Sequence, residues 1–281
     1  MKGIIKINRK LNLSSFKEID KGIYKNNPLN RKLGRVGQRY GKDKEEEDLK
    51  FDVNLSTDEQ YFDKSTNSWD ERRIKNVHIP IIEKYTKGIK SHENPVVTLM
   101  MGAPSSGKGT VRNSIKNEYN FGDSTVDPDD IKKVDLKNDY DKYQKADIKT
   151  AASMVHEESS YLAKEIINKL IDKKANFTID KVFSEYDKLS KQIQQLVDKG
   201  YKVNIVYASL PKEVAYERML ERGKKEGRYI LESYFNKAHD NIVKTFDKIK
   251  NDNRLNSIRQ YSTNVKIGEK PVLILHKQKD N

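Results

Sequence analysis

Two absences limit the kinds of protein that this 281-residue chain can be. It contains no cysteine, which excludes disulfide bonds and thiolate metal sites and is compatible with a reducing cytoplasm. No apolar run approaches the roughly 20 residues that a helix needs to cross a bilayer. The basic N-terminus, MKGIIKINRKLNLSS, also lacks the continuous apolar segment of a signal peptide. We therefore expect a cytoplasmic protein with no membrane partner.

The net charge of +13 is concentrated in the first 42 residues. These hold 12 Lys/Arg against Glu18 and Asp20, a charge of +10, which leaves +3 for the rest of the chain. A basic arm on a near-neutral body favours a tether that makes weak contact with nucleic acid or another partner. An arm that only keeps the chain soluble is the alternative, and it explains the same charge pattern. With the acidic cluster Asp43–Asp48 as a linker, we expect an arm over residues 1–60 and a folded domain over 61–281.

Past residue 95, short apolar runs alternate with helical patterns, and this alternation predicts βαβ units. The class expected is therefore α/β, a three-layer domain with a mostly parallel sheet. A helix over 68–87, capped by Ser68 and divided by Pro80, precedes the sheet. The expected strands are 96–101, 177–179 and 203–210, with 272–275 at an edge, and the later helices are 107–118, 151–173, 186–199 and 231–250.

A glycine-rich segment lies directly between the strand expected at 96–101 and the following helix. Its pattern is Gly, four residues, Gly and Lys, in which backbone N–H groups and a helix N-terminus can surround a phosphate. Lys108 would reach the β- and γ-phosphates of ATP or GTP. Gly109 stands where the usual pattern has Ser or Thr, so the next residue, Thr110, is the candidate Mg²⁺ contact. A ligand-free glycine turn is the alternative, which the flanking strand and helix disfavour. The loop comprises Gly102, Ala103, Pro104, Ser105, Ser106, Gly107, Lys108, Gly109 and Thr110.

Acidic residues follow two further apolar segments. Asp127, Asp129 and Asp130 follow Thr125-Val126, and Asp180 ends the strand expected at 177–179. Carboxylates near a nucleotide's phosphates can take a proton from an acceptor hydroxyl or orient Mg²⁺. An ordinary Asp-Pro turn with a helix cap explains the first cluster equally well.

A group of arginines comes later in the chain. Arg218 and Arg222 share one helical face. Gly223 and Gly227 come next, and Arg228 follows them, ahead of the next helix. Arginines on a mobile segment can neutralise the charge of a transferring phosphoryl group. A solvated basic face is the alternative, and the phosphate loop in the same domain favours a lid.

These motifs together resemble the zeta toxin-like kinases, especially their phage- and mobile-element-encoded branch. The similarity runs from about Tyr61 to Tyr261 and includes SWDERR, GAPSSGKGT, VDPDDIK, VHEESSYLAKEIINKL, GYKVNIVYASLP and NKAHDNIVKTF. The resemblance implies a P-loop kinase fold and phosphorylation of a hydroxyl on a small molecule such as UDP-N-acetylglucosamine, with ATP or GTP and Mg²⁺. It also implies an antitoxin protein as a partner, and a location in the host cytoplasm or virion if a phage encodes the chain.

The resemblance assigns roles to particular residues. It makes Asp129 the general base, with Lys108 on the phosphates, and places Arg222 and Arg228 on the lid. Asp180 falls where the toxins have a substrate-binding glutamate, but Lys181-Val182 replaces the Gly-Thr that follows it there. A second substrate-binding glutamate of the toxins aligns with Lys164 or Glu165. The other candidate substrate-binding residues are Asp127, His156, Glu157 and Glu158.

Two histidines are interpreted from their neighbours. His156, beside Glu157 and Glu158, has no further ligands at metal-binding spacing, so an acceptor pocket is favoured over a metal site. His239 is expected to pack the last long helix under the lid. Two alternatives to a small-molecule kinase remain open at this point: a nucleic-acid-directed kinase that uses the basic arm, and a phage structural or cargo protein that binds nucleotide without turnover.

Overall fold

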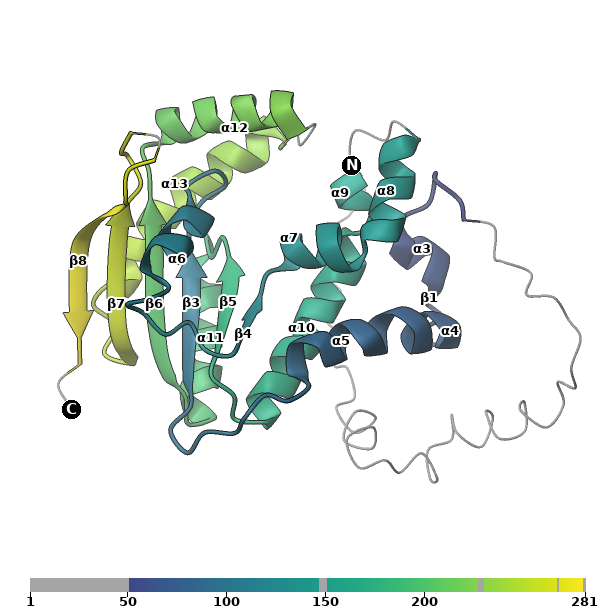
Figure 1. Cartoon of the computed structure of the whole chain (residues 1–281), viewed down its shortest axis with the longest axis horizontal. Helices are drawn as coiled ribbons and strands as arrows, with labels where there is room; N and C mark the ends of the chain where they lie inside the picture. The colour runs from purple at the N-terminus through teal and green to yellow at the C-terminus, as the bar shows by residue number, and fades with distance from the viewer. Residues whose placement is uncertain (1–50, 147–150, 227–229, 267, 280–281) are drawn as a thin grey trace, which may run out of the picture. The chain divides into compact units, whose positions relative to one another are not determined.

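The computed structural model describes residues 51–146, 151–226, 230–266 and 268–279 (Figure 1). Residues Asp52–Asn281 form one compact unit around a six-stranded sheet. Its first five strands are parallel and the last is antiparallel, so the expected α/β fold with a mostly parallel sheet is confirmed. In sheet order the strands are β4 (Ser124–Val126), β5 (Phe177–Lys181), β3 (Val96–Met101), β6 (Lys202–Ser209), β7 (Leu255–Ser262) and β8 (Val272–Gln278).

Helices cover both faces of the sheet. Consecutive strand residues point to opposite faces, and β6 shows which helix lies on each. Val206 packs with residues of α6 (Lys108–Ile115), whereas the ring of Tyr207 lies 4.4 Å from that of Phe246 in α13 (Glu232–Ile249). α11 (Tyr186–Asp198) packs beside α13.

The remaining elements lie before, between and after the central strands. Before β3 come α3 (Thr57–Tyr61), β1 (Phe62–Asp63), β2 (Ser68–Trp69), α4 (Glu71–Arg73), the π-helical turn η1 (Ile74–His78) and α5 (Ile79–Thr86). Between β4 and β5 come α7 (Pro128–Asp130), the π-helical turn η2 (Ile131–Asp135), α8 (Lys137–Lys145), α9 (Ala151–Met154) and α10 (His156–Asp172). α12 (Lys212–Glu226) follows β6.

Two expectations about elements were wrong, and one strand was missed. Ser68 does not cap a helix but belongs to β2, and the cap is Asp70, whose carboxylate accepts the N–H of Arg73. The helix expected over 151–173 is divided at Val155 into α9 and α10. Strand β7 was not foreseen, because its pairing with β6 and β8 buries a segment whose own sequence is largely polar.

The edge strand expected at 272–275 is present as β8 and is exposed along almost its whole length. Val272, Leu273 and Ile274 each keep about half of their surface in solvent (53%, 46% and 53%). In the described ranges, no helix combines the length and the apolar content needed to span a membrane.

Candidate functional site

The loop between β3 and α6 has the backbone of an anion-binding turn. Ser105 and Gly107 both take positive φ angles, 61° and 80°. A serine in the left-handed region is strained, and such strain is concentrated at functional sites. A Cβ added to Gly102 would lie 2.5 Å from Ser106 Oγ and 2.6 Å from Lys108 Cγ, so only glycine fits there. The loop therefore has the shape expected from its sequence.

Two hydroxyl groups in this loop have no hydrogen-bond partner in the described part of the chain. Ser105 Oγ and Ser106 Oγ are both buried, and no described residue hydrogen-bonds either atom. Buried polar atoms without partners are uncommon and call for an explanation such as an absent ligand. A phosphate held at this loop would supply acceptor oxygens to both hydroxyls, so the residues present fit a nucleotide's phosphates.

The loop lysine faces an acid on the neighbouring strand. Lys108 Nζ donates to Gly102 O at 3.0 Å and lies 3.7 Å from Asp180 Oδ1. Arg112, one turn further along α6, approaches the other oxygen of Asp180 at 3.7 Å. Burial raises the pKa of Asp180 to about 6; Lys108 opposes this shift and Asp127 adds to it. Two cations and a buried acid thus meet at the carboxyl edge of β3 and β5.

Two side chains from distant parts of the chain hold the loop from outside. His239 in α13 donates from Nε2 to Pro104 O at 3.0 Å. Thr263, just after β7, donates its hydroxyl to Ser106 O at 2.7 Å. Arg218 in α12 in turn donates to Thr263 O at 2.9 Å. Arg218, which we expected on the lid beside Arg222, therefore holds Thr263, and Thr263 holds the loop.

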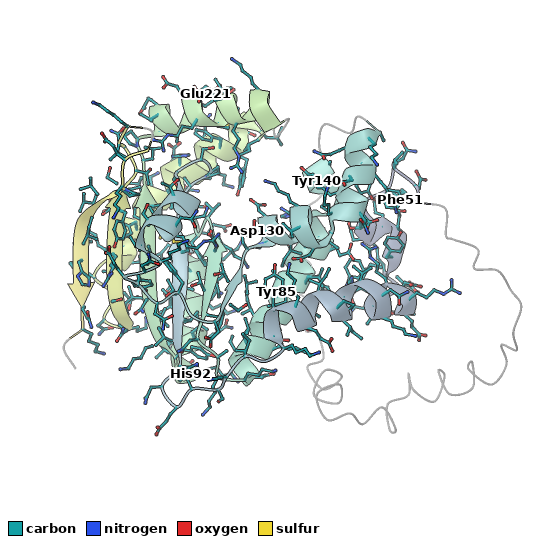
Figure 2. All side chains as sticks on the ribbon, viewed as in Figure 1. Phe51, Tyr85, His92, Asp130, Tyr140 and Glu221 are labelled. Atoms are coloured by element: carbon teal, nitrogen blue, oxygen red, sulfur yellow. The ribbon has the colours of Figure 1, made fainter. Side chains whose placement is uncertain are left out.

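The acids after β4 divide between two sides of α7, which lies at the carboxyl edge of the sheet where Figure 2 labels Asp130. Asp127 caps α7 by accepting the N–H of Asp129 at 2.8 Å. Burial raises its pKa, and Lys108 acts against that shift. Asp129 is half exposed and its carboxylate lies 3.2 Å from Lys132 Nζ. Asp127 thus belongs with the phosphate loop, whereas Asp129 faces outward.

The surroundings of Asp129 come from three helices. His156, the first residue of α10, is close enough to Asp129 and Lys132 for electrostatic interaction with both. Tyr234 of α13 also interacts electrostatically with Asp129 and leaves 51% of its surface exposed. The structure therefore places His156 near the candidate base and adds Tyr234, for which no sequence motif was a signal.

Glu158 lies apart from these residues. It is fully buried and receives hydrogen bonds from Arg73 at 2.7 and 2.8 Å and from His78 at 2.7 Å. Burial alone would raise its pKa, but these hydrogen bonds lower it to about 2. Both carboxylate oxygens are engaged in a cluster that joins α4, η1 and α10. Glu157, one residue earlier, points to solvent.

Two of the remaining candidate site residues lie on helices α6 and α12. Thr110 is exposed on the first turn of α6, one residue after the exposed Gly109. Arg222 is half-buried in α12, whereas Arg228 lies outside the described residues. Within the described ranges, no three His, Asp or Glu side chains gather closely enough to hold a metal ion on their own.

Comparison with known proteins identifies the family. The family model described as Zeta toxin matches residues 82–273. Toxin zeta of Enterococcus hirae is 28% identical over 141 residues, 50% of this chain and 49% of that protein. Toxin zeta of Streptococcus agalactiae is 27% identical over 160 residues, 57% of this chain and 53% of that protein. The chain thus spans about half the length of the curated relatives it matches.

Solved structures share the fold. A chain of the PezAT chromosomal toxin–antitoxin system of Streptococcus pneumoniae superposes with a TM-score of 0.58 at 17% identity, over 74% of this chain and 82% of that one. A chain of the AvrRxo1-ORF1:-ORF2 complex with ATP gives 0.57 at 20% identity, over 79% and 76%. Identities this low show the fold alone. Because the family model covers well over half of the sequence, however, the chain belongs to the zeta toxin family.

Proposed function

We propose that this protein is a phosphotransferase that binds ATP or GTP at the loop 102–110 and transfers the γ-phosphoryl group to a hydroxyl of a small molecule. The observation that carries the proposal is the pair of unpartnered buried hydroxyls, Ser105 and Ser106, beside Lys108. A relative of the same fold was solved in complex with ATP, which supports the choice of nucleotide.

Each group has a distinct role in this reaction. Lys108 binds the β- and γ-phosphates, and the loop's N–H groups hold the same oxygens. Asp129 accepts the proton of the attacking hydroxyl, because its carboxylate is accessible and lies outside the phosphate loop. Arg222 and Arg228 neutralise the charge that spreads over the transferring phosphoryl group. Transfer forms the bond from acceptor oxygen to phosphorus and breaks the bond to the leaving nucleoside diphosphate.

The donor set near the phosphates also fits Mg²⁺. Thr110 offers a hydroxyl, and Asp127 and Asp180 offer carboxylate oxygens, one of which, Asp180 Oδ1, accepts no hydrogen bond from any described residue. Mg²⁺ is commonly held by one or two carboxylates together with substrate phosphates, and these residues offer that donor set. When bound, the ion would neutralise phosphate charge.

The acceptor pocket is proposed around Asp129, His156 and Glu157. Its substrate would be a nucleotide sugar such as UDP-N-acetylglucosamine, the acceptor that the family resemblance implies. Lys181-Val182, in place of the toxins' Gly-Thr, favours a related acceptor of different shape. Two similar structures belong to a toxin–antitoxin system and to a two-protein complex, which supports an antitoxin as partner. A phage or mobile-element origin and a cytoplasmic location complete the proposal.

The two-part division of the chain is also a proposal. The basic residues 1–42 lie outside the described part, and we propose them as a tether for nucleic acid, a virion component or another protein. The proposed boundary lies near residue 60, and the described residues ahead of it already pack on the kinase unit: Tyr143 donates to Leu55 O at 2.6 Å.

Radiolabelled ATP and a bacterial metabolite extract test the function directly. The full chain should label one or a few small molecules at a hydroxyl, and pure UDP-N-acetylglucosamine should be tried in parallel. Lys108→Ala should abolish labelling. Lys116→Ala, at the other end of α6, is the matched control and should label normally.

Three outcomes would count against the proposal. Nucleotide binding without transfer to any molecule would leave a binding protein. Labelling of added RNA or DNA ends in place of metabolites would make the protein a nucleic-acid kinase. Unchanged labelling by Lys108→Ala would place the chemistry elsewhere in the chain.

A further inference from the structure

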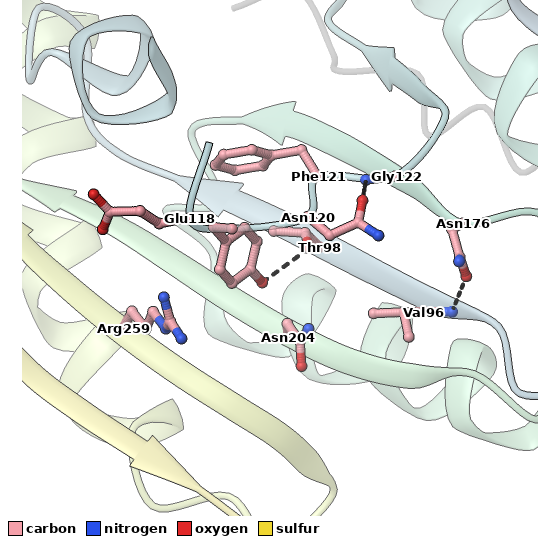
Figure 3. A pocket seen from close by; sticks show the side chains of 10 residues that line it. Val96, Thr98, Glu118, Asn120, Phe121, Gly122, Asn176, Asn204 and Arg259 are labelled. Carbon is pink, nitrogen blue, oxygen red and sulfur yellow. Dashed lines mark hydrogen bonds between the residues drawn. The ribbon is translucent and has the colours of Figure 1, made fainter. Parts of the chain in front are cut away.

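A cavity of about 290 Å³ lies on the sheet face that carries α6 (Figure 3). α6 is eight residues long, and with Tyr119 it covers the part of the sheet around Met100, Val206 and Tyr261. The amino-terminal part of the same face, from Val96 onward, forms the floor of the cavity. The cavity exists because the helix is too short to cover the whole strand length.

The floor is polar where the face of an enclosed sheet is usually apolar. Thr98 and Asn204 are paired neighbours on β3 and β6, and both are buried. Thr98 Oγ1 lies 3.0 Å from the hydroxyl of Tyr119, which closes one side of the cavity. Asn204 Oδ1 accepts a hydrogen bond from Asn256 Nδ2 at 2.8 Å, so each of these two buried side chains has a partner within the protein.

A cation that forms no ion pair with a described acid lines the cavity. Arg259 on β7 places its guanidinium 4.9 Å from the centre of the Tyr119 ring. No described carboxylate pairs with it, and its Nε is buried without a hydrogen-bond partner among the described residues. Glu118 also lines the cavity, but it is solvent-exposed and forms no ion pair with Arg259. The Arg259 charge is therefore not paired with a carboxylate among the described residues, although Glu118 lines the same cavity.

Two asparagines add hydrogen-bond donors. Asn120 Oδ1 accepts the N–H of Gly122 at 2.8 Å, and Asn176 Oδ1 accepts the N–H of Val96 at 2.7 Å (Figure 3). A backbone N–H can only donate, so these bonds fix the oxygens and leave the NH₂ groups of both side chains available. No described residue accepts from either NH₂ group. The cavity thus offers amide and guanidinium donors, and Glu118 on its solvent-exposed side is the one acidic side chain among the described residues that line it.

We propose that this cavity binds a small oxyanion, a molecule with a carboxylate or phosphate group, which Arg259 and the amides of Asn120 and Asn176 hold. Oxyanions offer only acceptors, which complements the donors on this wall. The volume is at the lower end of the range for small-molecule sites, so the ligand is smaller than a nucleotide. The site begins at Val96, the first residue of β3, whereas the phosphate loop follows the last, so the two are at opposite ends of one strand.

Calorimetric titration of the full chain with succinate and with glycerol 3-phosphate tests the proposal and separates the two anion classes. At least one probe should bind with one-to-one stoichiometry. Arg259→Gln should weaken that binding at least about tenfold, the usual effect of losing a charge-assisted hydrogen bond. Arg259→Lys should retain part of the affinity, because it keeps the charge but not the planar fork.

Arg254→Gln is the matched control. Arg254 precedes the same strand but pairs with Asp252 outside the cavity, so this variant should bind like the parent. Circular dichroism checks folding, and if Arg259→Gln does not fold, Asn120→Ala at the exposed rim replaces it in the comparison. No saturable binding of either probe to the parent, or parental binding by the cavity variants, would overturn the proposal. Neither result depends on activity at the phosphate loop.

Discussion

Arg73 and Glu158 form a two-point ion pair inside the protein, with Nε and one terminal nitrogen of the guanidinium 2.7 and 2.8 Å from the two carboxylate oxygens. Asp139 shares the same guanidinium. Arg73→Met would remove the guanidinium that two buried acids share, and breaking a buried ion pair typically lowers the free energy of unfolding by about 3–5 kcal/mol. Urea unfolding measures this loss. Arg72→Met, at the neighbouring exposed position, should change little, and equal effects of the two variants would contradict the assignment.

The pH dependence of stability should show the cost of burying Asp180. Its pKa rises from an ordinary 3.8 to about 6 on folding. Between these values the unfolded chain ionises first, so the contribution of Asp180 to stability falls as pH rises from 4 to 7, by about 2 kcal/mol. Asp180→Asn lacks this loss, so its stability relative to the parent should increase over the same range. Urea unfolding at pH 4 and pH 7 decides it, and parallel profiles would refute the prediction.

The hydroxyl of Thr263 should matter for nucleotide binding although its bond to the loop is made to a backbone oxygen. Thr263→Val keeps the shape of the side chain but removes the bond to Ser106 O. One hydrogen bond contributes about 1 kcal/mol, so ATP affinity should fall about fivefold. Thr263→Ser keeps the hydroxyl and should bind ATP like the parent. Calorimetry on both variants provides the measurement, and a serine variant as weak as the valine variant would argue against the hydrogen bond.

Turnover should distinguish Asp129 from Asp127. Asp129→Asn cannot accept a proton, so transfer should slow at least about 100-fold while ATP affinity stays near that of the parent. Asp127→Asn should behave differently: asparagine still caps α7, and the change acts beside Lys108, on nucleotide binding. If Asp127→Asn loses turnover at unchanged affinity and Asp129→Asn does not, the roles of the two acids are exchanged.

Arg222 and Arg218 offer a contrast within one helix. Arg222→Ala should lower kcat far more than it weakens ATP binding, because the proposed interaction is made in the transition state. Arg222→Lys should restore only part of the rate. Arg218→Ala acts through Thr263, so it should weaken ATP binding and change kcat less. Steady-state kinetics with direct ATP binding separates these effects, and a parental kcat in Arg222→Ala would remove it from the mechanism.

Local patterns predicted the parts of the fold that are determined locally. Three elements carry local signals of their own. β3 is a short apolar run, the loop after it is marked by its glycines, and α11 ends just before Gly200, a typical helix cap. β7 does not, because Asn256, Arg259 and Gln260 interrupt its apolar pattern and its burial comes from the strands on either side. The order of strands in the sheet likewise depends on contacts between distant segments.

The site was predictable to a similar degree. The phosphate loop and its neighbouring acids follow strand ends, which a sequence reveals. Glu158 was grouped with His156 because they are close in sequence, but residues two apart on a helix face different directions. Glu158 therefore points into the protein while His156 is exposed. The supports from His239 and Thr263 had no local signal, since they lie more than 130 residues beyond the atoms they contact.

The link between Ser106 and Thr263 also sets an order of events during synthesis. The loop leaves the ribosome 157 residues before the threonine that completes its support. At about 5–20 residues per second, this interval is roughly 10–30 seconds. During this interval the nascent chain contains the loop, but β7 does not yet pair with β6 and the hydroxyl of Thr263 does not yet bond Ser106 O. Full competence to hold a nucleotide is therefore acquired late in translation, when nearly the whole folded unit has been made.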